Sequence, residues 1–345
     1  MIDVILTGLG TFFLGTGVVW ALVRVILGYS ESRGALIDIP NPRSSHESPT
    51  PRGGGLSMVA LFLGAIFCFQ LTRALEFSKF MALFWGAALV AGIGIVDDFG
   101  HVAARWRLLI HLIAAAWSLA WIGGFPALSF GDSVADLGVL GYPIGMLFLV
   151  WLLNLFNFMD GIDGIAASEG LFICFSAVMF CGLGGALAPV PVEFWILIVL
   201  AAGCAGFLVW NWPPASIFMG DSGSGFLGFI LGLMALITAT RGLLSIWCWL
   251  ILFGVFIADT GVTLIRRILN RQCWYEAHRS HAYQHASRRY GSHRAVTLGV
   301  IAIDLLWLLP LAFCAWIWPG FGFLFCALAL IPLCIFAYRS NAGML

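Results

Sequence analysis

Charged residues are scarce in this sequence. Only 10% of its 345 residues are Asp, Glu, Lys or Arg, whereas 61% are hydrophobic. A soluble domain carries about 25% charged residues, because water must solvate its surface. The composition therefore excludes an ordinary soluble domain. The apolar residues instead form runs long enough to cross a bilayer as helices, whose backbone hydrogen bonds are satisfied internally.

Paired cysteines, linkers and repeats are also missing. The nine cysteines stand singly and form no Cys-x-x-Cys pair, so the usual zinc sites and disulfide frameworks are not expected. No low-complexity tract or internal repeat divides the chain, which predicts one polytopic membrane domain over residues 1–345. The first residues lack the basic region of a cleavable signal peptide and predict the first membrane span. No feature of the sequence predicts a nucleic-acid partner.

Eleven apolar segments predict an all-α integral membrane protein with ten to eleven transmembrane helices. The segments at 80–96 and 224–240 are short, and each is expected to be a tilted or partly re-entrant span. The expected spans are 3–28, 55–72, 80–96, 107–124, 138–156, 165–187, 193–210, 224–240, 243–264, 295–317 and 320–338.

The basic residues predict the orientation of these spans. With the N-terminus outside and the C-terminus in the cytoplasm, 14 of the 17 Lys and Arg residues lie on the cytoplasmic side, as the positive-inside rule requires. Nearly all of the polar residues then face the cytoplasm. They lie in five segments, 29–54, 97–106, 157–164, 211–223 and 265–294.

Two adjacent acids follow an apolar run in the segment GIVDDFG. Asp97 and Asp98 are costly at the end of a membrane span, and two such neighbours resist joint ionisation unless a cation neutralises them. The pair therefore indicates a Mg²⁺ or substrate site, with a solvated helix end as the alternative.

Two further motifs place acids and amides next to glycines. NLFNFMDGIDG contains Asn157, Asp160 and Asp163, and oxygen ligands beside glycines suit a hard cation or a phosphate. In NWPPASIFMGDSGS, Asp221 lies in a Gly/Ser turn that opens the next helix, where backbone N–H groups favour anions and the carboxylate can hold a cation. The alternatives are a cluster of helix caps and a plain capped turn.

The longest cytoplasmic segment is rich in basic and imidazole side chains, including His278, Arg279, His281 and His285. Such donors suit a diphosphate sugar. A patch that faces anionic lipid is the alternative.

Two other features carry polar chemistry. The loop IDIPNPRSSHESPTPRGGG contains Arg43 and His46 and is expected to contact a nucleotide or phosphate, or else to be a turn-rich connector. Asp259 lies inside an expected span, and acids within membrane spans are functional by default.

Together these motifs resemble those of the polyprenyl-phosphate N-acetylhexosamine-1-phosphate transferase superfamily, also called glycosyltransferase family 4. VDDFG is similar to its Asp-Asp motif, NLFNFMDGIDG to its Asn-x-x-Asn-x-x-Asp-Gly-x-Asp-Gly motif, and NWPPASIFMGDSGS to its third long motif. The resemblance covers residues 30–300. Members include the peptidoglycan translocase MraY and the O-antigen initiator WecA.

The resemblance implies roles for individual residues. It places Asp221, with Asn157 beside it, at the Mg²⁺ ion, for which Mn²⁺ is an alternative. It places the catalytic Asp97 and Asp98 at the phosphates. Asn211, Phe218 and Asp163 would line the uridine pocket, with Asn157 and Asp160 beside it. The other residues expected to bind substrate are Arg105, Arg43, His46, His278, Arg279, His285 and Asp259.

The chain departs from the family pattern at two places. The lysine expected shortly after the acid pair is absent, and Arg105 or Arg107 takes its place. The segment HRSHAYQH stands in place of the translocase's triple-histidine loop. This segment looks closer to the WbpL-type O-antigen branch and argues against a muropeptide substrate. His281 is taken as the catalytic family histidine, with His278 and His285 as alternatives.

The function implied is transfer of an N-acetylhexosamine 1-phosphate from a UDP-sugar to undecaprenyl phosphate, with release of UMP. The acceptor phosphate would attack the β-phosphorus in line, in one step or through a phospho-aspartate. The expected setting is the bacterial inner membrane, with the active site facing the cytoplasm, a role in O-antigen or cell-envelope polysaccharide synthesis, and a homodimer as one assembly.

Two hypotheses from other classes compete with the transferase. A proton- or cation-coupled transporter predicts acids near the bilayer midplane and a repeated half. A membrane scaffold that recruits partners through its basic loop leaves the aspartate motifs unexplained.

Overall fold

A computed structural model describes residues 2–40, 48–100, 102–183, 190–272 and 278–344 as a bundle of helices. The all-α prediction is confirmed, since two short hairpins are the only strand pairs in these ranges. β1 (Ile37–Asp38) pairs with β2 (Thr50–Pro51), and β3 (Leu128–Phe130) pairs with β4 (Ser133–Ala135), both antiparallel.

The helices follow the expected apolar segments. Short π-helical turns at Met81–Trp85 and Asp304–Leu308 continue α3 into α4 and α13 into α14. In chain order the helices are α1 (Ile2–Arg33), α2 (Leu56–Leu71), α3 (Phe77–Phe80), α4 (Gly86–Phe99), α5 (Ala104–Ile122), α6 (Gly141–Met159), α7 (Ile165–Leu183), α8 (Val192–Asn211), α9 (Asp221–Thr240), α10 (Ile246–Leu252), α11 (Gly254–Leu269), α12 (Ala282–Tyr290), α13 (His293–Ile303), α14 (Leu309–Ile317) and α15 (Gly322–Arg339).

Eight helical stretches in the described ranges are long and apolar enough to cross a membrane. The bent pair α10 and α11 would make a ninth. The total of ten to eleven spans and the orientation of the chain stay predictions. Neither segment expected to be short is short: one extends over Phe77–Phe99 and the other over Asp221–Thr240.

The expected span at 243–264 is not one straight helix. α10 and α11 meet at an angle of 76°. The bend lies at Phe253, between the two helices, and α11 begins at Gly254, where a Cβ would lie 2.9 Å from the end of the Leu308 side chain. The apolar run continues through the bend, so hydrophobicity alone did not reveal it.

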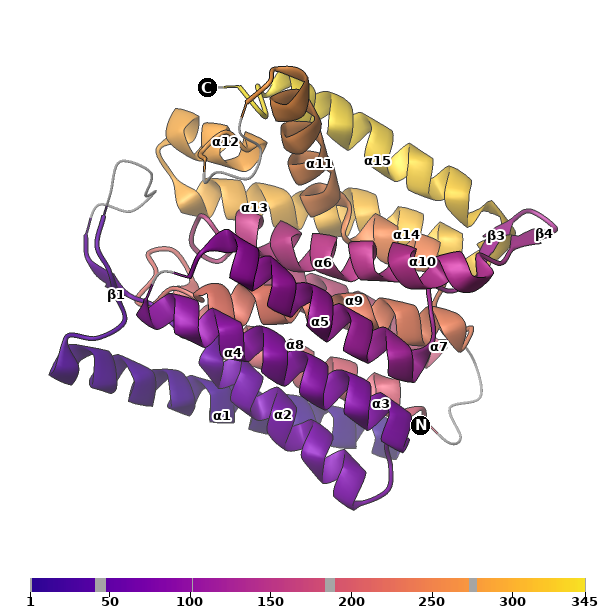
Figure 1. Ribbon diagram of the computed structural model, residues 1–345, viewed down its shortest axis with the longest axis horizontal. Coiled ribbons are helices and arrows are strands. Elements are labelled where there is room, and N and C mark those ends of the chain that lie inside the picture. The colour runs from indigo at the N-terminus through magenta and orange to yellow at the C-terminus, as the bar shows by residue number, and fades with distance from the viewer. Residues whose placement is uncertain (1, 41–47, 101, 184–189, 273–277, 345) are drawn as a thin grey trace.

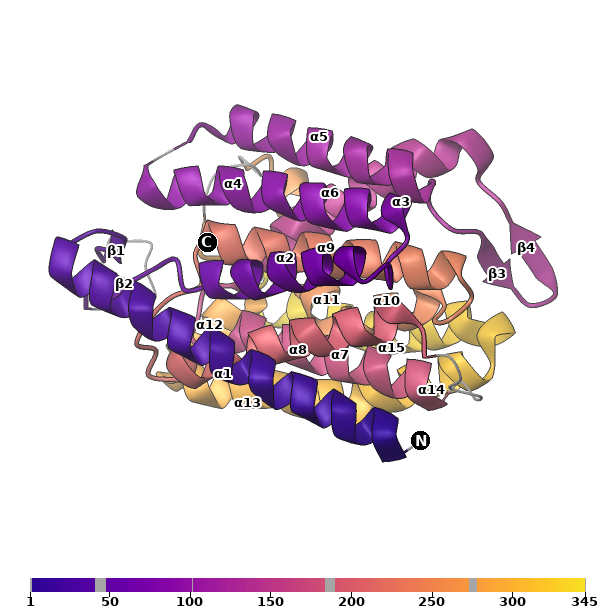
Figure 2. The ribbon, with the colours of Figure 1, turned by 90° about the horizontal axis from the view of Figure 1, so that it is seen from below.

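Helix α9 is the centre of the bundle. It is almost wholly buried and packs against α4 and α6, while α8 packs against α1 and α7 (Figure 2). Glycines permit the close approach of its first turn to its neighbours. A Cβ on Gly94 would lie 2.5 Å from the Ser222 Cα, and one on Gly55 would lie 2.3 Å from the Gly223 Cα.

Four loops far apart in the sequence gather at one end of the bundle, here called the site end (left in Figure 1). There α4 and α6 end, α5 and α9 begin, and the β1–β2 hairpin lies beside them. The N-terminus and the β3–β4 hairpin lie at the opposite end. The fold thus brings the acidic motifs of three separate segments together.

Candidate active site

Asp98, near the end of α4, holds the first turn of α9. Its carboxylate accepts hydrogen bonds from the Asp221 N–H at 3.0 Å, the Ser222 N–H at 3.2 Å and the Ser222 hydroxyl at 2.7 Å. The first N–H groups of a helix have no partner within the helix, so a buried carboxylate satisfies them well. Asp98 is 3% exposed. Its side chain therefore positions Asp221.

Gly220 makes this arrangement sterically feasible. Its φ is 79°, and a Cβ there would lie 2.8 Å from both carboxylate oxygens of Asp98. Any larger residue would be strained and would push the carboxylate away from α9. The Arg52 guanidinium donates to the Asp98 main-chain carbonyl and ties the β2 end of the hairpin loop to the same point.

Arg107 bridges two acids that are distant in sequence. Its Nη1 lies 2.7 Å from Asp97 Oδ2 and 2.8 Å from Asp221 Oδ2. The other oxygen of Asp97 accepts from the Val102 N–H at 2.7 Å. Both carboxylates are thus held around one cationic nitrogen.

Asn157 fixes the other oxygen of Asp221. Its Nδ2 donates to Asp221 Oδ1 at 3.0 Å and to the Ser224 hydroxyl at 3.1 Å. The amide comes from the last turns of α6, so three helices orient one carboxylate. In this arrangement Asn157 acts as a donor to Asp221, and its role as a metal ligand stays a prediction.

Asp160 adds to the negative charge at this end. Burial raises the pKa of Asp160 well above its usual range, and the charges of Asp221, Asp98 and Asp163 raise it further. A carboxyl group whose ionisation is disfavoured by three neighbouring acids indicates that the site has too little positive charge to neutralise them. A bound cation would relieve that deficit.

Asp163 and Asn211 join two loops of the site end. Asp163 accepts from the Ala215 N–H at 3.1 Å and lies 3.2 Å from His293 Nδ1. Asn211 accepts from the Gly164 N–H and donates to the Ile217 carbonyl, both at 2.9 Å. Both polar atoms of the buried Asn211 amide are therefore engaged within the protein.

Phe218 is held through its backbone. Its N–H donates to the Pro51 carbonyl at 2.8 Å, and its carbonyl accepts from the Gly54 N–H at 3.0 Å. These bonds attach the loop before α9 to the β1–β2 hairpin, and leave the partly buried Phe218 ring at the same end as Asp221. Its contact with a base stays a prediction.

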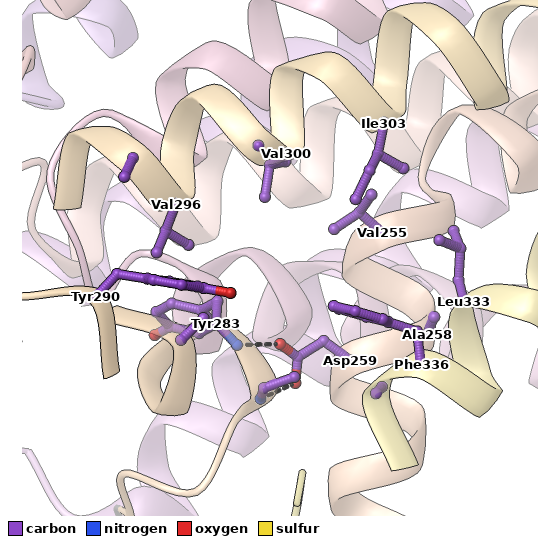
Figure 3. Close-up of a pocket in the computed structure, with 15 residues that line it drawn as sticks. Val255, Ala258, Asp259, Tyr283, Tyr290, Val296, Val300, Ile303, Leu333 and Phe336 are labelled. Atoms are coloured by element: carbon purple, nitrogen blue, oxygen red, sulfur yellow. Dashed lines mark hydrogen bonds between the residues drawn. The ribbon is translucent and has the colours of Figure 1, made fainter. Parts of the chain in front are cut away.

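Asp259 holds the histidine segment through α12. Its carboxylate accepts from the Ala282 N–H and the Tyr283 N–H, both at 2.9 Å (Figure 3). It also lies 3.2 Å from His281 Nδ1. The Tyr283 hydroxyl then donates to the Phe158 carbonyl at 2.9 Å, which docks α12 on the end of α6. The observed contacts make Asp259 an anchor for His281, and its expected contact with substrate stays a prediction.

The other histidines of this segment differ in environment. The ring of His278 stacks on that of His281, with 4.9 Å between centroids. Burial lowers the pKa of His278 to about 4, aided by the charges of His281 and Arg267. Burial also lowers the pKa of His285, whose Nδ1 lies 3.0 Å from Arg288 Nη2. Arg279 is partly buried in the same loop.

Among the expected site residues in the described ranges, Arg105 is not brought to the acids. Arg105 is exposed, with its guanidinium 5.6 Å from the centre of the Trp106 ring, so Arg107 and not Arg105 contacts the cluster. Arg43 and His46 lie outside the described residues. Sequence reasoning noted His293 among the histidines of the basic segment but assigned no role at the site to His293 or Tyr283, because only the fold places them beside Asp163 and Phe158.

The donor set fits a magnesium ion that is shared with a substrate. In the described ranges no three His, Cys, Asp or Glu side chains are grouped like a protein-only metal site. Magnesium usually takes one or two carboxylates and completes its shell with water and substrate phosphates. Asp221 and Asp97, which share one Arg107 nitrogen, offer such a pair.

Comparison with known proteins gives one consistent result. The profile described as glycosyl transferase family 4 matches residues 80–239. A probable undecaprenyl-phosphate N-acetylglucosaminyl 1-phosphate transferase of Bacillus subtilis is 32% identical over 275 residues, which is 78% of this chain and 75% of that protein.

Two further relatives cover similar shares. The decaprenyl-phosphate N-acetylglucosaminephosphotransferase of Mycobacterium tuberculosis is 31% identical over 82% of this chain and 75% of its own length. A phospho-N-acetylmuramoyl-pentapeptide-transferase of Desulfitobacterium hafniense is 31% identical over 65% of this chain and 70% of its own length. All three are named as sugar-phosphate transferases, and two are named for polyprenyl-phosphate acceptors.

Proposed function

Because this chain belongs to glycosyl transferase family 4, we propose that it transfers an N-acetylhexosamine 1-phosphate from a UDP-sugar to undecaprenyl phosphate. One observation carries the proposal most directly. Arg107 holds Asp97 and Asp221 around one nitrogen at the start of α9, with Asn157 on the far oxygen of Asp221.

The reaction proposed is an in-line displacement at phosphorus. An oxygen of the lipid phosphate forms a bond to the β-phosphorus of the UDP-sugar, the bond to the UMP oxygen breaks, and UMP leaves with the electron pair. Such transfers depend on positioning and charge neutralisation more than on covalent chemistry by the protein. A phospho-aspartate route would need a carboxylate free to attack, and Asp98 is engaged by three donors from α9.

The residues of the site divide into orienting and contacting groups. Asp98 and Asn157 orient Asp221, and Asp259 orients His281. Arg107 would pair with a phosphate oxygen, and Asp221 and Asp97 would hold the divalent ion. Mg²⁺ bound there would neutralise charge on the diphosphate. Asp163 and Phe218 would contact the nucleoside.

The names of the relatives favour a first donor to test. Two of them are named for N-acetylglucosamine, so we propose UDP-N-acetylglucosamine ahead of UDP-QuiNAc and UDP-FucNAc. The product would be a lipid-diphosphate sugar that initiates O-antigen or another cell-envelope polysaccharide. We place the site end of the bundle on the cytoplasmic face of the bacterial inner membrane, where nucleotide sugars are available.

The test is product formation by the purified protein in nanodiscs. The protein is incubated with UDP-N-acetylglucosamine, undecaprenyl phosphate and Mg²⁺, and UMP and the lipid product are quantified by mass spectrometry. We expect the two products in equal amounts, and none in the presence of EDTA. Free UDP as the nucleotide product, or transfer that persists in EDTA, would refute the mechanism.

A further inference from the structure

A pocket of about 190 Å³ lies between α11, α12, α13 and α15. Figure 3 shows Tyr283 and Tyr290 of α12 at one end of the pocket, and Val255, Ile303, Leu333 and Phe336 at the other. Asp259 contributes a carboxylate to the wall, but both of its oxygens already accept hydrogen bonds from α12 N–H groups. The lining therefore suits an apolar ligand.

The size of the pocket limits that ligand to part of a hydrocarbon chain. An apolar cavity of about 150 Å³ already admits a benzene-sized molecule. A pocket of about 190 Å³ accommodates a stretch of methylene groups and no complete lipid. The rest of the ligand must lie outside.

The pocket is continuous with the lipid-facing surface of the bundle. Phe336 lines it and is also 61% exposed. Ala295 and Gly299 of α13 also line it and are exposed. The pocket is lined by two pairs of packed helices, α12 with α13 and α11 with α15. A chain can therefore enter from the bilayer.

Basic side chains border the pocket at the site end. Arg289 follows Ala286 by three residues and Ala282 by seven, so it lies on the stripe of α12 that lines the pocket. Arg294 lies in the first turn of α13, directly before the lining residue Ala295. Both arginines are exposed. Basic pockets between membrane helices bind the head groups of anionic lipids.

We propose that this pocket binds one acyl chain of an anionic phospholipid whose head group lies against Arg289 and Arg294. None of the described residues that hold Asp97, Asp98 or Asp221 lines the pocket, which favours a bilayer lipid over the acceptor substrate. Because α12 also carries the contact between Asp259 and His281, the lipid would brace the histidine segment. The inference rests on the membrane placement of the bundle and is independent of the proposed reaction.

The test is photo-crosslinking in nanodiscs of phosphatidylcholine that contain a little phosphatidylglycerol with a diazirine on its acyl chain. We expect the label on peptides that cover residues 295–303 and 333–337. Gly299→Trp fills the pocket, because a Cβ at Gly299 meets nothing within 4 Å. It should lower this labelling about tenfold, equivalent to about 1.4 kcal/mol of binding. Leu298→Trp, on the exposed side of α13, is the matched control and should not lower it.

The head group is tested separately. Arg289→Gln should lower phosphatidylglycerol labelling about fivefold, as expected for loss of one basic contact, whereas Arg24→Gln on α1 should not. Ala295→Leu narrows the same pocket and replaces Gly299→Trp if that variant does not fold. Equal labelling of Gly299→Trp and Leu298→Trp would overturn the site. Equal labelling by a phosphatidylcholine probe, or displacement by equimolar undecaprenyl phosphate, would overturn the proposed occupant.

Discussion

The two ends of the bundle use acids differently. At the end away from the site, Glu193 is buried between Lys79 at 3.0 Å and Arg241 at 2.9 Å, and Glu76 also pairs with Lys79. Two acids face two cations there. At the site end five acids, Asp97, Asp98, Asp160, Asp163 and Asp221, lie near Arg52 and Arg107.

This difference in charge balance distinguishes the ion-pair cluster around Glu193 from the proposed active site. Balanced charges close an ion-pair network and hold α3, α8 and the end of α9 together. Excess carboxylates at the site end are retained against their mutual repulsion, which is the condition for binding a cation and an anionic substrate together. The predictions below test whether the two ends separate stability from transfer in this way.

The largest effect is expected from Asp221→Ala. Loss of the carboxylate that Arg107, Asn157 and the α9 turn position should lower kcat by about 10³-fold or more, because charge neutralisation of the diphosphate is lost. UMP release by purified protein measures it. Asp132→Ala, in the exposed β3–β4 turn at the other end, is the control and should keep normal turnover.

The second-largest loss of activity is expected from substitutions of Arg107. Arg107→Gln removes the cation that both Asp97 and Asp221 contact and should lower kcat/KM by about 10²-fold. Arg107→Lys should recover part of the loss. Arg105→Gln supplies the matched comparison, since that guanidinium lies over Trp106. A larger loss of kcat/KM for Arg105→Gln than for Arg107→Gln would show that Arg105, and not Arg107, acts at the site.

Glu193→Ala should lower the stability of the protein and leave its transfer activity intact. Removing one partner of a buried ion pair leaves Lys79 and Arg241 uncompensated and costs about 3–5 kcal/mol of stability. We expect a lower thermal midpoint in detergent, with unchanged KM for the UDP-sugar at a temperature where the variant is folded. A changed KM or Mg²⁺ dependence would show that the two ends are not separate.

The smallest effect concerns pH. The pKa of His278 is lowered from 6.5 to about 4, so below pH 6.5 the unfolded chain binds the proton more readily than the folded one. Stability should therefore fall as pH falls from 6.5 toward 4. His278→Gln should flatten this part of the thermal-midpoint profile. A profile unaltered by His278→Gln would place the pH dependence elsewhere.

The membrane helices, and the acids that gather at the site end, could be predicted from the sequence for a physical reason. Long apolar runs specify membrane helices whatever their partners, and the costly Asp97–Asp98 pair stands out in such a chain. The bend at Phe253 was missed because the apolar run passes through it.

Contacts between distant segments were not readable from the sequence. Arg105 and Arg107 are two residues apart on one helix, and only the position of α9 decides which of them reaches Asp221. Asp259 was recognised as unusual, but its partners on α12 follow more than 20 residues later. The contact between Asp259 and α12 depends on how α12 packs against α11, and the sequence alone does not specify that packing.

Ion binding at the site end can be measured without turnover. Mn²⁺ electron paramagnetic resonance on the purified protein with saturating UDP-N-acetylglucosamine should detect one bound ion that Mg²⁺ displaces. Asp221→Ala should abolish that signal, and Glu193→Ala should leave it intact. Equal Mn²⁺ binding by the wild type and Asp221→Ala would contradict the account of the carboxylate excess.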